Sequence, residues 1–166
     1  MMSRYSGFFL KATAACVLVG LLGLPVPADE ENPLNIQASI SPQRLSRGQE
    51  GKVLLRITTD RGIIIIPQPS LTIEFDPSEE LVFPKNFFTA SDLEIEVLKE
   101  EGRECLNLSN AIEIPFTVSM EAPSGSHQLE GKVKYFAFSR SEGWCLKKTV
   151  KFQAAFSTRS TVYRKR

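Results

Sequence analysis

Three cysteines and a single histidine are the side chains of this 166-residue chain best suited to nucleophilic, redox or metal chemistry. With one histidine, a Ser-His-Asp site could form only through His127, and a metal site with several histidine ligands is excluded. His127, Cys105 and Cys145 could supply three zinc ligands, but they lack the short paired spacing of a structural zinc site. We therefore expect no metal and no cofactor. His127 lies in a Pro-Ser-Gly-Ser turn, so we expect it to be solvated.

The first 28 residues have the layout of a secretory signal peptide. Arg4 and Lys11 precede an uncharged run over residues 12–24. The segment closes with Pro25-Val26-Pro27-Ala28, which ends in a small residue, and the acidic Asp29-Glu30-Glu31 follows. The uncharged run is shorter than the ~20 apolar residues that a membrane span needs. We predict cleavage after Ala28 and a periplasmic or secreted mature protein, with an uncleaved N-terminal membrane anchor as the alternative.

Cleavage would remove Cys16 and leave Cys105 and Cys145 in a compartment where disulfides persist. A bond between them would close a loop of about 40 residues, for which chain entropy alone gives about 4 kcal/mol of stabilisation. The oxidising compartment favours this disulfide, provided that the two Cα atoms come within about 7 Å. In the alternative interpretation Cys145 is a reactive thiolate, favoured by Lys147 and Lys148 if these lysines point toward it.

Alternation of apolar and polar residues dominates the mature chain and predicts half-buried strands. Such runs occur at residues 34–40, 53–57, 71–75, 93–97, 112–120, 129–138 and 150–156, and the apolar run 63–66 suits a short strand buried on both faces. Turn signals rich in Pro, Gly, Ser and Asp separate the runs, and no segment has a sustained helical period. About eight short strands predict an all-β protein, an immunoglobulin-like antiparallel β-sandwich. A closed barrel is the alternative.

Composition limits the function classes further. The chain has 20 Lys+Arg and 19 Asp+Glu, a formal net charge of +1, so it lacks the broad basic surface that nucleic-acid binding requires. We predict a signal peptide over residues 1–28, one domain over residues 29–157, and a basic tail over residues 158–166. The paired carboxylates at residues 79–80 and 100–101 are expected to be solvated in loops.

The segment of residues 124–138, followed by Gly143-Trp144-Cys145 and residues 148–152, resembles the amino-terminal domain of the thiol:disulfide interchange protein DsbD family. In that family a glycine-containing strand ends in Tyr-x-x-Cys, and a short loop, a second cysteine and another strand follow. The resemblance covers residues 35–156 and is specific over residues 124–152. It implies a periplasmic immunoglobulin-like domain whose two cysteines, on neighbouring strands, pass electrons from a membrane domain to partner oxidoreductases.

In this resemblance Cys145 matches the second family cysteine, and Phe138 stands where the family has the first. A phenyl ring cannot exchange with a disulfide. The chain also lacks the family's multi-span membrane domain and a thioredoxin-like Cys-x-x-Cys. We therefore predict a non-catalytic protein-interaction module of the cell envelope, with another envelope protein as partner, such as a thioredoxin-like or membrane redox protein. The alternatives are a thiol-disulfide exchange protein that uses Cys145 with Cys105 or with a partner's cysteine, and a purely structural accessory domain.

Overall fold

The computed structural model describes residues 32–159, and these belong to one unit of the chain, Glu31–Arg166. The predicted signal peptide, its cleavage site and Cys16 lie outside the described residues, as does most of the predicted basic tail. Between residues 32 and 159 the chain forms twelve strands and no helix. It follows that this part of the chain contains no helix able to cross a membrane.

The strands have the following bounds, in chain order: β1 Leu34–Ser41, β2 Arg44–Ser46, β3 Glu50–Thr59, β4 Ile63–Ile65, β5 Thr72–Phe75, β6 Leu81–Val82, β7 Phe87–Thr89, β8 Val97–Glu100, β9 Arg103–Leu106, β10 Ile112–Val118, β11 Gly125–Ser139 and β12 Cys145–Arg159.

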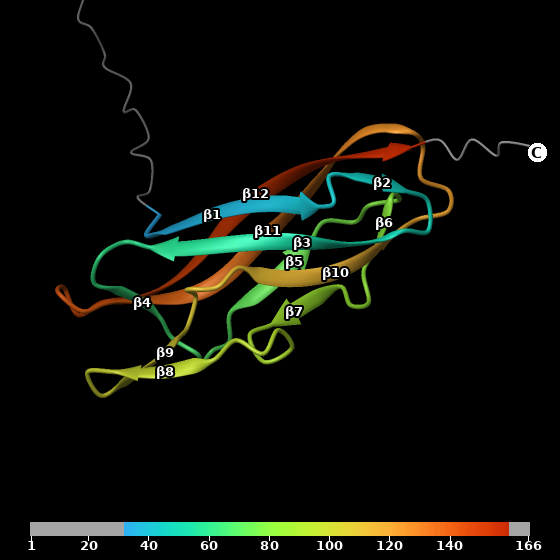
Figure 1. Cartoon of the computed structure of the whole chain (residues 1–166). Helices are drawn as coiled ribbons and strands as arrows, with labels where there is room; N and C mark the ends of the chain where they lie inside the picture. Colours follow the sequence, from blue (N-terminus) through green and yellow to red (C-terminus); the bar gives the residue numbers. More distant parts are fainter. Residues whose placement is uncertain (1–31, 160–166) are drawn as a thin grey trace, which may run out of the picture. The chain divides into compact units, whose positions relative to one another are not determined.

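Two sheets pack face to face around one core (Figure 1). The first sheet has the strand order β1-β3-β10-β6, and the second has the order β2-β12-β11-β5-β7, with β4 also paired to β11. The β8–β9 hairpin forms a small sheet of its own. All pairs are antiparallel except β2 with β12. The predicted fold class, an immunoglobulin-like β-sandwich, is confirmed.

Strand β11 shows why the sequence folds in this way. Its odd-numbered residues from Leu129 to Ala137 are buried in the core, and its even-numbered residues face outward. Gly131 is one of these buried residues, and the neighbouring atoms leave no room for a side chain at its position. A Cβ at this position would meet Phe152 Cζ at 2.5 Å and the backbone oxygen of Glu74 at 2.8 Å. The glycine therefore lets β5 and the Phe152 ring approach β11 closely.

Two of the predicted strands are shorter in the structure. Of residues 93–97 only Val97 is in a strand, because the Asp92 carboxylate accepts hydrogen bonds from Thr89 N and Thr89 Oγ1 (both 2.9 Å) and holds a turn. β10 ends at Val118, so Met120 lies beyond the strand and is exposed. At the other end of the domain β12 continues to Arg159, two residues past the predicted boundary.

Candidate functional site

The β11–β12 hairpin sets Phe138 and Cys145 directly opposite each other, as Cα partners in the antiparallel register. A tight connection closes the hairpin: Gly143 N donates to Ser139 O (2.9 Å), and Ser139 N donates to Trp144 O (3.0 Å). Gly143 has a φ of 72°, in the left-handed region that favours glycine. The two positions that the family resemblance singles out are therefore neighbours across two strands.

Phe138 is covered by the β8–β9 hairpin. The guanidinium carbon of Arg103, on β9, lies 4.0 Å from the centre of the Phe138 ring, which is the geometry of a cation–π contact. Such contacts contribute about 0.5–1 kcal/mol at partly exposed sites. The ring is half-buried, so this position supplies packing and no nucleophile.

Arg140, the residue after β11, forms ion pairs with two glutamates of the same β8–β9 hairpin. Its guanidinium donates to the Glu100 carboxylate and lies 3.6 Å from Glu101 Oε2. The hydrogen bond to Glu100 raises the pKa of Arg140, and the charges of both glutamates raise it further. The sequence analysis expected these two glutamates to be solvated in a loop. They remain partly exposed, but they bind the β8–β9 hairpin to the end of β11.

Cys105 is 3% exposed and lies on β9 opposite Leu98. Burial raises the pKa of its thiol, and the negative charge of Glu100 adds to this effect. The residue lines a cavity of about 560 Å³, which Arg140 and the β3–β4 connection also line. A buried thiol with a raised pKa is protonated near neutral pH and is a poor nucleophile.

Cys145 is exposed at the start of β12. Strand alternation places Lys147 on the same face as Cys145 and Lys148 on the opposite face, so only one of the two lysines points the way that thiolate activation requires. Both cysteines of residues 32–159 are free in this structure, one buried and one exposed. The Cys105–Cys145 disulfide therefore stays a prediction about the oxidised protein.

The sequence analysis expected His127 to be a solvated turn residue, and this prediction is wrong. His127 belongs to β11, and only 10% of its side chain is exposed. Its Nε2 lies 2.8 Å from Thr158 Oγ1 and 3.0 Å from Pro123 O, and its Nδ1 faces Glu80 Oε1 at 3.6 Å. Thr158 gives its own hydroxyl proton to Pro123 O, so Thr158 accepts from His127 and Nε2 carries a proton.

The three candidate zinc ligands do not converge. His127 and Phe138 are eleven residues apart on β11, about 36 Å along a strand, and Cys145 is opposite Phe138. Within residues 32–159 no group of three or more His, Cys, Asp or Glu side chains is arranged to hold a metal ion.

Sequence reasoning could have found the burial of His127, because extending the inward alternation of β11 back from Leu129 reaches it. It missed Arg103 and Arg140 as neighbours of the site. Their contacts join segments more than 30 residues apart, and no local pattern marks them.

No family model and no curated protein matches the sequence. Similar solved structures include a cohesin module from a family 33 glycoside hydrolase of Clostridium perfringens, at 11% identity and a TM-score of 0.38, covering 76% of this chain and 96% of that one. A type I cohesin–dockerin complex from Clostridium thermocellum has 15% identity and a TM-score of 0.36 over 76% and 99% of the two chains. Murine CRIg has 6% identity and a TM-score of 0.32 over 76% and 98%. At these values the similarity carries no argument about function or partners.

Proposed function

We propose that this chain is an exported β-sandwich related to the amino-terminal domain of the DsbD family, and that it acts as a non-catalytic protein-interaction module in the cell envelope. The observation that carries the proposal is the position of Phe138. This ring lies opposite Cys145, where the family resemblance expects the partner thiol. Thiol-disulfide exchange by a self-contained relay needs a second thiol to resolve the mixed disulfide, and a phenyl ring cannot do so.

Cys105 is a poor substitute for the missing thiol. Its side chain is buried, and its raised pKa keeps it protonated near neutral pH. The Arg103–Phe138 contact also places the β8–β9 hairpin over the position where a second thiol would act. Both features favour a binding role over a redox role for this site.

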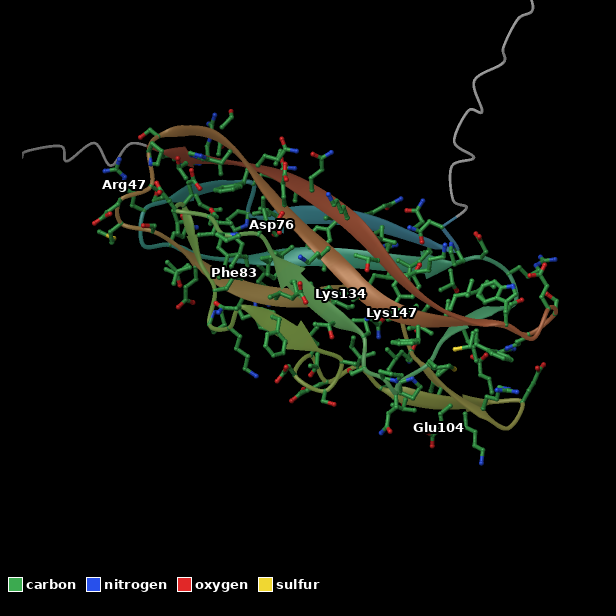
Figure 2. All side chains as sticks on the ribbon, turned by 180° about the vertical axis from the view of Figure 1, so that it is seen from behind. Arg47, Asp76, Phe83, Glu104, Lys134 and Lys147 are labelled. Atoms are coloured by element: carbon green, nitrogen blue, oxygen red, sulfur yellow. The ribbon has the colours of Figure 1, made fainter. Side chains whose placement is uncertain are left out.

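The outer face of the second sheet offers a surface that a protein partner could cover. One cross-strand row of this face runs through Lys151, Lys132, Glu74 and Phe87, and Phe87 is 53% exposed. Figure 2 shows Lys134 and Lys147 on the β11–β12 ribbon. Lysine stems and an exposed aromatic ring can contribute apolar contacts and charge to a protein interface.

Replacement of Phe138 by cysteine tests the proposal. Directly opposite residues of antiparallel strands have Cα atoms about 4.5–5.5 Å apart, which suits a disulfide. We expect the Phe138→Cys protein to form a 138–145 disulfide that a reduced thioredoxin-like protein can reduce. The matched variant Phe136→Cys, whose new thiol is opposite Lys147, should form none. The unmodified protein should transfer no electrons from that donor to a disulfide acceptor. Turnover that requires Cys145 would refute the non-catalytic proposal.

A second candidate function is exchange through Cys145 with a cysteine of a partner. It is favoured by the exposure of Cys145 and by Lys147 on the same face. This function predicts a mixed disulfide with a thioredoxin-like or membrane redox protein that is lost in Cys145→Ser and retained in Cys105→Ser. In the non-catalytic proposal, association with the partner persists in both variants. A purely structural accessory domain would form no mixed disulfide with such a protein and would not associate with it in either variant.

A further inference from the structure

Three segments that are far apart in the sequence meet at the end of the sandwich where β12 finishes. Gly48 N donates to Val118 O (2.9 Å) and Val118 N donates to Gln49 O (2.9 Å), which joins the β2–β3 turn to the end of β10. Ser119 N donates to Glu80 O (2.7 Å), which adds the segment that leads into β6. This end of the molecule is thus built from residues 46–50, 79–82 and 118–122.

Two large apolar side chains on these segments are exposed. Val82, on β6, is 59% exposed, and Met120, after β10, is 71% exposed. Met120 lies over the β2–β3 turn, since a Cβ placed on Gly48 would come within 2.9 Å of its Sδ atom. Val82 also lines a groove of about 860 Å³ together with Pro84 and Pro115. The two side chains therefore leave apolar surface open to solvent at one end of the sandwich.

Three carboxylates lie beside these apolar side chains. Glu50 follows the β2–β3 turn, Glu121 follows Met120, and Glu79 precedes the segment bound to Ser119. All three are exposed, and none forms an ion pair with another residue between 32 and 159. Arg47, which Figure 2 shows at this end, donates from Nε to Ala122 O at 2.7 Å. We call the set Val82, Met120, Glu50, Glu79 and Glu121 the end patch.

The chain leaves β12 next to the end patch. Arg159, the last residue of β12, is paired with Ser46 of β2, and Gln49 N donates to Ser46 O (3.1 Å) across the tight turn that leads to Glu50. Residues 160–166 have the sequence Ser-Thr-Val-Tyr-Arg-Lys-Arg, and they lie outside the described residues. A segment of seven residues is about 23–25 Å long when it is fully extended. This length exceeds the ~17 Å that the five residues 50–54 of β3, beside the groove, span.

We propose that residues 160–166 dock on the end patch of their own chain. Val162 and Tyr163 cover the exposed side chains of Val82 and Met120, and the three consecutive cations that follow lie among the three carboxylates. Apolar burial is an essential part of this docking, because exposed ion pairs contribute at most about 1 kcal/mol each. The docking does not depend on the proposed function, since no cysteine takes part in it.

A photo-crosslinking residue at position 163 of the full chain tests this docking. We expect cross-links within one chain to residues 48–50, 79–83 or 119–121, identified by mass spectrometry of the digested monomer. The same residue at position 146, at the other end of β12, should give no cross-link to these segments. Cross-links from position 163 that spread over both sheets, or that form only between two chains, would overturn the proposal.

Variants with reversed charges test whether the cations of the tail contact the carboxylates of the end patch. Arg164→Glu with Arg166→Glu should lower the yield of these cross-links at least five-fold, and adding Glu50→Arg with Glu121→Arg should restore it. Lys147→Glu with Lys151→Glu makes the same change of net charge on the outer face of β12 and should leave the yield unchanged. Because Glu50, Glu121, Lys147 and Lys151 are exposed, their substitution is expected to leave the fold intact. Equal yields in the two doubly reversed proteins would refute the assigned charge contacts.

Discussion

Substitution of His127 by alanine is expected to lower the free energy of unfolding by about 2–3 kcal/mol. The imidazole Nε2 is 2.8 Å from Thr158 Oγ1 and 3.0 Å from Pro123 O, and the ring centre lies 5.1 Å from that of Phe156. The single Nε2 proton, shared between the two oxygens, contributes about 1 kcal/mol net, and the ring contact contributes about 0.5–1.5 kcal/mol. The packing lost with the imidazole ring adds to this cost. With 10% of the side chain exposed, solvent compensates for little of this loss. For a domain of this size the melting temperature should fall by about 8–12 °C.

The loss should also depend on pH through Glu80. A hydrogen bond from the Ser78 hydroxyl, another from the Glu80 backbone N–H and the positive charge of His127 lower the pKa of Glu80 from its ordinary 4.5. A carboxyl with a lowered pKa in the folded state stabilises that state above its unfolded pKa, and the contribution disappears as the pH falls through the folded value. Without His127 the pKa is lowered less. The alanine variant should therefore lose less stability than the unmodified protein when the pH falls below 4.5.

Urea unfolding followed by the fluorescence of Trp144, the one tryptophan of the chain, measures both effects. Ser126→Ala is the control: Ser126 is an exposed neighbour on β11 whose hydroxyl makes no hydrogen bond within residues 32–159, and the change should alter stability by less than about 0.5 kcal/mol. His127→Gln should be intermediate, because an amide can donate to Thr158 but carries no charge. A His127→Ala protein within 0.5 kcal/mol of the unmodified one, or with the same acid dependence, would refute this account.

Three further outcomes are expected. Gly131→Ala should destabilise the protein by about 1–3 kcal/mol in the same urea assay, because its Cβ meets both Phe152 and the backbone of β5; a loss under 0.5 kcal/mol would contradict this. Burial raises the pKa of Tyr135 to about 12, so stability should fall as the pH rises from about 10 to 12, and Tyr135→Phe should lack this alkaline loss. In the native protein an alkylating reagent should label Cys145, and Cys105 only after unfolding. A protein with no free thiol in denaturant would instead establish the predicted disulfide.

Periodicity predicted the strands that have one face in the core and one in solvent. On β11 the burial of Leu129, Val133 and Tyr135 matches the sequence alternation, because a shift of one residue would expose the whole apolar set. Alternation failed over residues 93–97, where Leu93 and Ile95 are half-buried but not in a strand. There the Asp92 side chain takes the Thr89 backbone N–H, and this local hydrogen bond outweighs a weak strand tendency.

For the candidate site, sequence reasoning predicted that Phe138 and Cys145 lie near each other, because the family resemblance put them on neighbouring strands joined by a short loop. It could not predict what covers them. Arg103 reaches Phe138 from a hairpin 35 residues earlier in the chain, and the Arg140–Glu100 pair spans 40 residues. Such contacts depend on how the hairpin folds back on the sheet, and alternation along one strand carries no information about that.

The contact between Arg103 and Phe138 bears on why a phenyl ring is tolerated where the family resemblance expects a thiol. A cysteine at position 138 would have no π face for the guanidinium, so this cation–π contact would be lost. The ion pairs of Glu100 and Glu101 with Arg140, the residue that follows β11, would remain. The ring thus contributes to holding the hairpin in place over the sheet. Holding the hairpin and forming a redox pair with Cys145 are alternative uses of one position. The side chain present at 138 can perform only the first, which agrees with the proposed non-catalytic role.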